Sequence, residues 1–179
     1  MMKAKIKIKV LTNGCEPVII DKGEWIDLKA AKDMIIPAAQ AGTLKRKTVN
    51  NKEVSFRNVS MDTTYIPLGV AMKLPKGYEA IVASRSSGPK KLNLMIPSGM
   101  GIIDNSYSGN TDEWVYVCTT MKKATIHKGD RVCQFRIQLS QKATLWQKIK
   151  WLFTSGVELE FVDDLGDTAR NGLGSTGIN

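Results

Sequence analysis

The sequence contains few residues of the kinds that build disulfide, zinc or histidine-based sites. Its 179 residues include three cysteines and one histidine. Cys15, Cys118 and Cys133 are odd in number and widely spaced, so they predict neither a disulfide framework nor a zinc site. We expect them to be buried thiols in a reducing cytoplasm. His127 precedes a turn and is expected at the surface, which argues against a histidine-based mechanism.

Long apolar runs are also missing. No segment approaches the roughly 20 apolar residues that cross a membrane as a helix. The charged start, Met1–Lys5, is not followed by an apolar stretch, so no secretory signal is predicted. The sequence therefore favours a cytoplasmic protein, and its length suits a single domain, residues 1–179, that carries insertions.

Acidic residues are outnumbered, 17 to 26, which gives a net charge of +9. A basic protein suits nucleic acid, but the basic residues are dispersed, with short clusters at 45–47, 90–91 and 122–123. A phosphate-rich small molecule, or solubility alone, accounts for such a distribution equally well. The charge pattern therefore does not favour nucleic acid as the partner.

Short alternating or β-branched segments separated by turn residues predict an all-β fold. Residues 5–10 alternate polar and apolar side chains with the period of a half-buried strand. Further strands are expected at 17–20, 25–31, 33–37, 66–74, 78–83, 114–120, 132–139 and 157–162. This spacing indicates a barrel or jelly roll. The basic segment 43–60 predicts an inserted hairpin or loop, and the Gly- and Ser-rich segment 166–179 a flexible C-terminal arm.

One segment has helical periodicity instead. Residues 143–155 predict a short helical insertion, centred on 144–153, with four apolar side chains on one face: Leu145, Ile149, Leu152 and Phe153. Its lysines and tryptophans are compatible with a membrane-surface helix. We expect instead that it packs on its own barrel or on a neighbouring subunit.

The segment 101–109 places a carboxylate and an aromatic ring three residues apart, at Asp104 and Tyr107, between glycines that mark a sharp turn. Taken alone, a solvated turn with the ring packed on a sheet explains it equally well. Four other motifs accompany it in a fixed order along the chain: residues 25–28, 84–88, 129–134 and 170–177.

Together the five motifs resemble those of the trimeric dUTPases, the deoxyuridine triphosphate nucleotidohydrolases, including phage and bacterial members. The resemblance spans residues 23–177. It implies the family's jelly-roll-like β-barrel and a homotrimer whose sites are shared between subunits. It also implies Mg²⁺-assisted hydrolysis of dUTP to dUMP and pyrophosphate, with water attacking the α-phosphate in line.

The resemblance further implies a role for each motif. Asp104 orients the attacking water, Tyr107 packs against the deoxyribose and excludes ribonucleotides, and Asp27 holds Mg²⁺ through water. The remaining candidates contact substrate: Ser98, Gly101 and Ile102 in the uracil-reading hairpin, Arg85, Ser86, Ser87 and Gln134 at the phosphates, and Arg170, Leu173, Ser175 and Thr176 in the closing arm. Leu173 departs from the family, which has an aromatic residue stacking on uracil there.

Two alternatives remain open. A dCTP deaminase shares the fold but needs another carboxylate on the strand after Asp104, where Glu113 lies only at the edge. A nucleotide-regulated module would instead bind a regulatory protein partner through residues 43–60 or 143–155.

Overall fold

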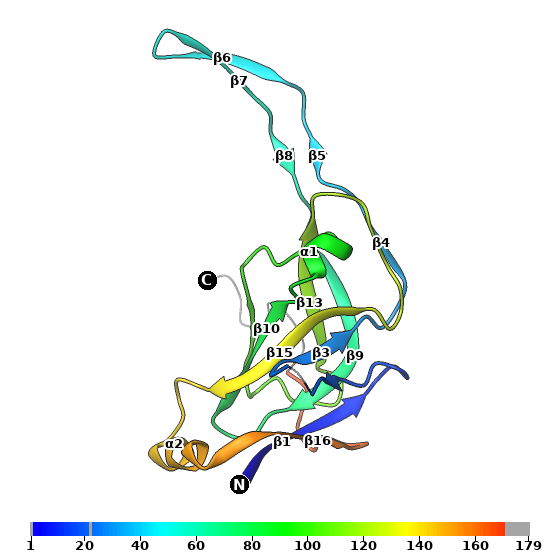
Figure 1. Ribbon diagram of the computed structural model, residues 1–179, viewed down its shortest axis with the longest axis vertical. Helices are drawn as coiled ribbons and strands as arrows, with labels where there is room; N and C mark the ends of the chain where they lie inside the picture. Colours follow the sequence, from blue (N-terminus) through cyan, green and yellow to red (C-terminus); the bar gives the residue numbers. More distant parts are fainter. Residues whose placement is uncertain (1, 22, 171–179) are drawn as a thin grey trace.

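The computed structural model describes residues 2–21 and 23–170. Two five-stranded sheets curl around a common core (Figure 1), so the prediction of an all-β, jelly-roll-like barrel is confirmed. In sheet order, the first contains β11 (Leu94–Met95), β13 (Glu113–Thr120), β9 (Thr64–Lys73), β1 (Met2–Val10) and β16 (Thr154–Phe161). The second contains β12 (Gly101–Ile103), β10 (Tyr78–Ser84), β15 (Arg131–Leu139), β3 (Ile26–Lys29) and β2 (Val18–Ile19).

Shorter elements complete the described chain. Three two-stranded pairs join β14 (Ala124–Ile126) to β4 (Met34–Ile36), β5 (Gln40–Ala41) to β8 (Val59–Ser60), and β6 (Lys45–Val49) to β7 (Lys52–Phe56). The helices are α1 (Gly88–Lys91) and α2 (Leu145–Leu152). Within residues 2–21 and 23–170, neither helix has the length and apolar content needed to traverse a membrane.

The core lies between the two sheets and follows from the alternation of each strand. In β1, Ala4, Ile6 and Ile8 are buried while the lysines between them are exposed. Trp114 of β13 meets Phe135 of β15 edge to face, with ring centroids 5.2 Å apart, which joins one sheet to the other. These contacts fix the curvature that brings distant motifs together.

The free cysteines belong to this interior. Cys15, Cys118 and Cys133 are all buried. Burial raises the pKa of Cys118 to about 11, so its thiol stays protonated at neutral pH. They are therefore inert packing groups.

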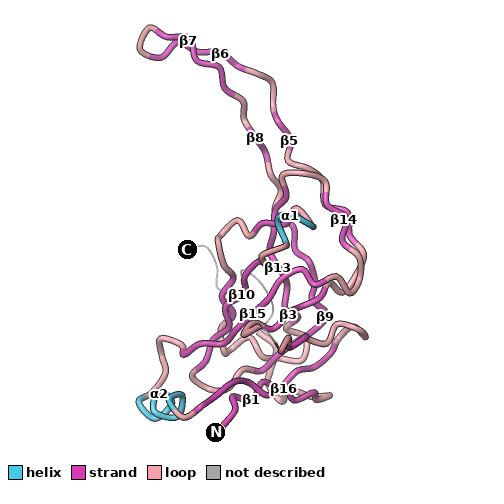
Figure 2. The backbone as a smooth tube through the Cα atoms, viewed as in Figure 1, coloured by secondary structure: helices cyan, strands magenta, loops and turns pink. Residues whose placement is uncertain are grey.

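A long two-stranded arm, residues 40–60, extends from one end of the barrel (Figures 1 and 2). The β5–β8 pair forms its base and the β6–β7 hairpin its tip. Asn50 and Asn51 close the tip with φ of 48° and 59°, the left-handed conformation that asparagine tolerates and a two-residue hairpin turn requires.

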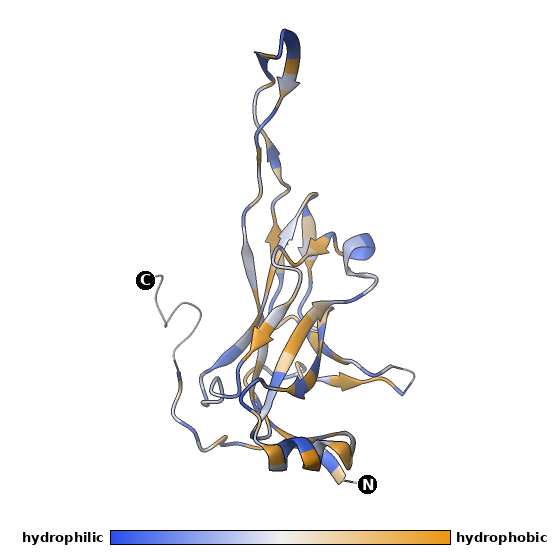
Figure 3. Cartoon of the chain, turned by 90° about the vertical axis from the view of Figure 1, so that its left-hand side faces the viewer, coloured by the Kyte–Doolittle hydropathy of each residue, from blue (hydrophilic) through white to orange (hydrophobic). Residues whose placement is uncertain are grey.

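Helix α2 lies at the opposite end (Figure 1). Thr144 caps it by accepting a hydrogen bond from the Gln147 N–H, and the Gln147 side chain accepts one from the Thr144 N–H in return. The expectation was packing on its own barrel or on a neighbouring subunit. Within this chain none of the helix residues is fully buried, and Gln147 and Ile149 are partly buried. Leu145, Trp146 and Leu152 are over 70% exposed, at 73%, 79% and 71%, and in Figure 3 hydrophobic and hydrophilic residues alternate along the helix.

Candidate active site

The second sheet gathers four of the five motifs on neighbouring strands. Its order, β12-β10-β15-β3, sets the third, second, fourth and first motifs side by side. In the β15 register Gln134 pairs with Asp27 on one side and with Ala83 on the other. In the β10–β12 register Val82 pairs with Gly101. Segments far apart in sequence thus meet through strand pairing.

Asp27 forms the centre of a charged cluster at one end of this sheet. Its side chain is only 2% exposed, and its two carboxylate oxygens accept from Arg85 Nε at 2.9 Å and Arg131 Nη1 at 3.1 Å. Arg85 also donates to the Arg131 carbonyl at 3.4 Å. Because a buried carboxylate needs paired charge, Asp27 fixes the direction in which Arg85 leaves β10.

Arg131 was not among the predicted site residues. It lies three positions before Gln134, in the fourth motif, and its contact with Asp27 joins strands that are far apart in the sequence. The contact between Arg131 and Asp27 follows from the pairing of β15 with β3, which the sequence alone does not reveal. The adjacent Asp130 accepts instead from the His127 N–H at 2.8 Å, which closes the turn before β15.

The predicted phosphate-binding residues follow β10 directly. Gln134 Nε2 donates to the Ser84 carbonyl at 3.2 Å and so ties β15 to the end of β10. Ser86 and Ser87 lie in the turn that leads into α1, where the Gly88 N–H donates to the Arg85 carbonyl at 2.9 Å. The Ser87 hydroxyl makes no capping bond to α1. The serine hydroxyls and the Arg85 side chain lie next to one another in the chain.

Asp104 lies on an anchored turn after β12. Its carbonyl accepts from the Tyr107 N–H at 3.0 Å, and Asn105 Nδ2 donates to the Leu74 and Pro75 carbonyls at 3.1 and 2.7 Å. The turn is therefore held against the end of β9 and the loop before β10. The Asp104 side chain is 64% exposed, so the carboxylate is available to a ligand.

Tyr107 is partly buried against the core. Its hydroxyl donates to the Glu113 carbonyl at 2.9 Å. Burial, together with the nearby Asp112 and Glu113 carboxylates, raises the pKa of Tyr107, so it stays a neutral ring and a donor at neutral pH. The ring orientation is thus fixed from both ends of the side chain.

The predicted uracil-reading hairpin is built around Gly99, whose φ of 81° favours glycine. Ser98 Oγ donates to the Met100 carbonyl at 3.0 Å, so this side chain stabilises its own turn. Gly101 pairs with Val82, and Ile102 pairs with Ile81 while leaving its side chain 59% exposed. The hairpin therefore presents the apolar Ile102 side chain to solvent.

Arg170 returns to the Asp104 turn of its own chain. Its Nη1 donates to Asp104 Oδ2 at 3.2 Å and to Ser106 Oγ at 2.9 Å. Its backbone N–H donates to the buried Asp112 carboxylate at 2.9 and 3.0 Å. The resemblance implied that Arg170 contacts substrate, and within one chain its guanidinium pairs with the Asp104 carboxylate.

The loop after Tyr107 anchors the segment before Arg170. Ser108 Oγ donates to Asp167, which also accepts from Lys73 Nζ at 2.7 Å. A Cβ on Gly109 would lie 2.2 Å from the Ala169 Cα, so only glycine fits there. Asp112, which the sequence analysis passed over, holds Gly109 and Arg170 together. Its place three residues after a glycine in a Gly-Asn-Thr-Asp turn was the available signal.

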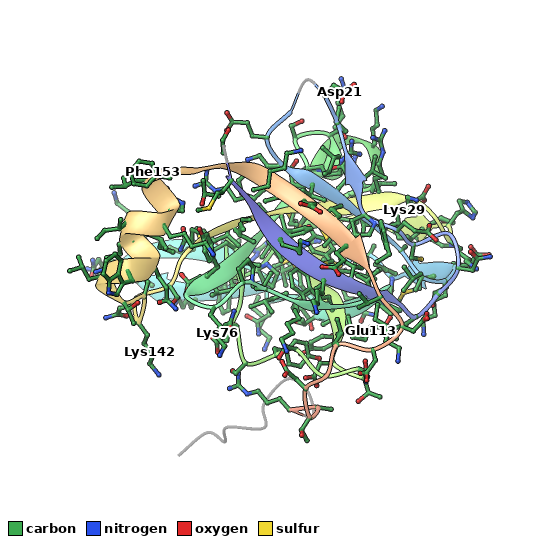
Figure 4. The ribbon with its side chains drawn as sticks, turned by 90° about the horizontal axis from the view of Figure 1, so that it is seen from below. Asp21, Lys29, Lys76, Glu113, Lys142 and Phe153 are labelled. Atoms are coloured by element: carbon green, nitrogen blue, oxygen red, sulfur yellow. The ribbon has the colours of Figure 1, made fainter. Side chains whose placement is uncertain are left out.

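A pocket of about 750 Å³ lies at the start of β10, beside Glu79 and the Asp104 turn. Its lining combines predicted and unpredicted residues: Glu79, Asp104, Asn105, Ser106, Ser140, Gln141, Lys142 and Arg170. Lys142 lies just before α2 and beside that helix in Figure 4. The lining therefore combines two carboxylates, Asp104 and Glu79, with two cations, Lys142 and Arg170, of which Arg170 contacts Asp104.

Asp27, Arg85 and Gln134 do not line this pocket. Asp104 lies beside Glu79, at the start of β10, whereas Arg85 follows its end. Six residues of strand correspond to roughly 20 Å. One chain therefore does not bring the phosphate-binding arginine to the Asp104 carboxylate. Leu173, Ser175 and Thr176 lie outside the described residues.

The Glu113 carboxylate is engaged in the barrel. Its Oε1 accepts from the Gly69 N–H at 2.8 Å, where Gly69 has a φ of 67°. This bond gives Glu113 a structural role at the β13–β9 edge. Glu113, the acidic residue on which the dCTP deaminase alternative depended, therefore has a structural role in the barrel.

Among the described residues, no group of three or more His, Cys, Asp or Glu side chains is arranged to hold a metal ion. Asp27 does not fit direct coordination, because each oxygen already accepts from a guanidinium. An ionised carboxylate has about four acceptor sites, so Asp27 fits a contact with a metal-bound water. That suits Mg²⁺, which retains several waters and takes phosphate oxygens.

Comparisons with known proteins agree with this geometry. The dUTPase family model matches residues 48–149. The SPbeta prophage-derived deoxyuridine 5'-triphosphate nucleotidohydrolase YosS of Bacillus subtilis (strain 168) is 37% identical over 174 residues, covering 97% of this chain and 98% of the relative. A deoxyuridine 5'-triphosphate nucleotidohydrolase of Orientia tsutsugamushi (strain Boryong) is 30% identical over 119 residues, covering 65% and 70%.

Solved structures share the fold. The dUTPase of Streptococcus mutans superposes with a TM-score of 0.58 at 19% identity, covering 77% of this chain and 98% of that one. A mutant dUTPase from phage phi11 of S. aureus, described as coordinating a structural Mg(II) ion, gives 0.57 at 16%, covering 78% and 94%. With the family model and the YosS relative, these findings show that the chain belongs to the dUTPase family.

Proposed function

We propose that the Asp104 turn is the catalytic centre of a dUTP diphosphatase. As a member of the dUTPase family, the chain is an enzyme that hydrolyses dUTP to dUMP and pyrophosphate. The observation that supports Asp104 is its exposed carboxylate on a turn held at both ends, since a proton acceptor must be both accessible and fixed.

In this proposal the Asp104 carboxylate holds a water in line with the α-phosphorus and takes its proton. The water oxygen forms a bond to the α-phosphorus while the bond from that phosphorus to the bridging oxygen of the leaving pyrophosphate breaks. Holding the water and the phosphate together removes most of the entropic barrier to their encounter. Tyr107, fixed by its bond to the Glu113 carbonyl, provides a flat surface for the deoxyribose.

Arg85, Ser86 and Ser87 donate to the α- and β-phosphates in this proposal. Asp27 supports that role, because its bond to Nε orients the guanidinium. Nη1 also donates to the Arg131 carbonyl at 3.4 Å, and the proposal directs Nη2 to the phosphates. Gln134 holds the end of β10 in place. Mg²⁺, when bound, would be held by phosphate oxygens and a water that donates to Asp27, and it would offset charge on the leaving pyrophosphate.

The distance between Arg85 and Asp104 supports a site that is shared between subunits of a homotrimer. The two residues follow opposite ends of β10. A neighbouring copy that presents its own Asp104 turn to the Arg85 end would complete the site. The uracil contacts would then come from Ser98, Gly101 and Ile102 of the same copy as Asp104.

We propose that the C-terminal arm, residues 166–179, closes over bound substrate. The Arg170 contact with Asp104 is exposed and therefore weak, so a triphosphate competes for the guanidinium and frees the carboxylate. Leu173, Ser175 and Thr176 would then cover the base and phosphates and exclude water. Asp112 accepts from the Arg170 N–H and so keeps the start of the C-terminal arm in place during this exchange.

The apolar face of α2 supports a regulatory protein partner, as an additional role that coexists with catalysis. Exposed large apolar side chains on that face or at its margin are Leu145, Trp146, Leu152 and Phe153, and Trp151 is exposed on another side of the helix. Such patches mark interaction sites in proteins. The enzyme is proposed to act in the cytoplasm.

The test of the catalytic proposal compares an Asp104→Asn variant with the parent on dUTP, dCTP, dTTP and UTP with Mg²⁺, following both pyrophosphate and ammonia. Loss of a proton acceptor predicts a fall in kcat of roughly 100-fold or more on dUTP. Asp62→Asn, an exposed carboxylate outside the five motifs in the sequence, is the matched control and should retain parental activity. Parental turnover by the Asp104 variant would overturn the assignment, and ammonia from dCTP would point to a deaminase.

A further inference from the structure

The arm of residues 40–60 has no role in the site described above. Every residue in it is exposed except Phe56, which is partly buried. Figure 2 shows it standing clear of the barrel along most of its length. Two-stranded ribbons without a third strand or a helix behind them are marginally stable in water. Packing within this chain therefore gives no reason for the arm's composition.

Positive charge is concentrated on this arm. Five basic residues and one acidic residue give segment 43–60 a net charge of +4: Lys45, Arg46, Lys47, Lys52 and Arg57 against Glu53. Only Arg46 has an acidic partner there, Glu53 at 3.6 Å, and both side chains are more than 60% exposed, so the pair neutralises little.

Strand register places the lysines together. Lys45 pairs with Phe56, Lys47 with Val54, and Val49 with Lys52. Directly opposed residues share a face and alternate residues return to it, so all three lysines lie on one face with three apolar side chains between them. Lys47 Nζ lies 5.2 Å from the centre of the Phe56 ring, which holds its ammonium above that face.

We propose that this arm is a DNA-binding ribbon that inserts into the major groove of B-form duplex and contacts its phosphates without reading sequence. A major groove about 12 Å wide admits a two-stranded ribbon. The five pairs of β6–β7 extend for roughly 17 Å. The exposed lysines and arginines then face phosphates on both sides. In the sequence, the dispersed basic clusters did not indicate a nucleic-acid partner. In the folded chain, the cluster at residues 45–47 stands apart from the barrel (Figure 2).

Charge decides between partners. A second copy of the chain has a net charge of +9, so its surface offers the basic arm less charge complementarity than a polyanion does. Duplex DNA has about one negative charge per 1.7 Å of axis, the densest complement available. The narrow major groove of A-form RNA does not admit side chains. The inference goes beyond dUTP hydrolysis, because the proposed catalytic site uses no residue of segment 40–60.

The test measures binding of the full chain to a fluorescein-labelled 20-base-pair duplex by anisotropy. With about four phosphate contacts, affinity should fall roughly 100-fold between 50 and 200 mM salt. The K45Q/K47Q/K52Q variant should bind at least about 10-fold more weakly at low salt, and its salt slope should be smaller by about 2.7. K3Q/K122Q/K123Q removes the same charge from exposed barrel positions and should bind within about threefold of the parent.

Several results would overturn the proposal: no binding at 50 mM salt, equal weakening in both triple variants, or equal binding of an A-form RNA duplex. Competition by polyglutamate as strong as by DNA would indicate an acidic protein instead. A change in oligomer size in the arm variant would indicate a contact between subunits. Both variants should hydrolyse dUTP at the parental rate, so a failure of DNA binding leaves the catalytic assignment unaffected.

Discussion

Replacing Asp27 with Asn tests whether this residue positions Arg85. The carboxylate is 2% exposed and accepts from two guanidiniums. Breaking a fully buried ion pair costs about 3–5 kcal/mol. The Arg85 side chain is 22% exposed and the Arg131 side chain 43%, and pairs with exposed partners contribute at most about 1 kcal/mol. We therefore expect the variant to lose about 3 kcal/mol, mostly from Arg85.

For a chain of this size, that loss lowers the melting temperature by roughly 6–12 °C. The assay is thermal and urea unfolding at fixed protein concentration, with and without Mg²⁺, because the stability of the proposed homotrimer depends on protein concentration. Asp62→Asn, at the surface, should change stability by less than about 0.5 kcal/mol. Arg131→Ala should cost about 1 kcal/mol or less.

The positioning role also predicts weaker use of dUTP by the Asp27 variant, with a raised KM that excess Mg²⁺ does not correct. An unfolding midpoint equal to that of the parent, combined with activity restored by high Mg²⁺, would refute this reasoning. Asp27 would then serve the metal and not the arginine.

Three further predictions concern Asp112 and Asp167, which anchor the start of the C-terminal arm, and helix α2. Asp112→Asn should raise the KM for dUTP and destabilise the fold by about 2 kcal/mol, because the Arg170 and Gly109 N–H groups lose a charged acceptor; steady-state kinetics and urea unfolding measure both, and an unchanged KM would contradict it. Hydrogen bonds from Lys73 and Ser108 lower the pKa of Asp167 from 3.8, so its stabilising contribution is present above that pH and is lost as pH falls through the folded pKa; acid unfolding of Asp167→Asn should show less pH dependence between 5 and 2, and an identical acid transition would count against it. Trp146→Ser should change stability by less than about 0.5 kcal/mol, because the side chain is 79% exposed; a large drop in melting temperature would show that α2 is covered in the free protein.

The strands of the barrel were predictable because each alternates or is β-branched over several residues. The pattern of residues 5–10 matches the burial of β1, and the helix near 144–153 is present with its Thr144 cap. Periodicity reports which face of an element is apolar. It does not report what covers that face, which is why the exposure of α2 differs from expectation.

The site was predictable as a set of motifs but not as a geometry. Pairing of Gln134 with Asp27 depends on the β15–β3 register, and the separation of Arg85 from Asp104 depends on the direction of β10. Both are long-range properties of a sheet. Arg131 and Asp112 were missed for the same reason, because their partners lie 104 and 58 residues away in the sequence.

A subunit-mixing experiment tests the central claim most directly. Asp104→Asn and Arg85→Gln variants, each inactive alone, are denatured together in equal amounts, refolded and assayed for pyrophosphate release from dUTP. If one subunit supplies Asp104 and its neighbour Arg85, about a quarter of the sites in random trimers contain both intact residues. We predict activity near one quarter of refolded parent. Mixed trimers that remain as inactive as the separate variants would contradict a catalytic centre shared between subunits.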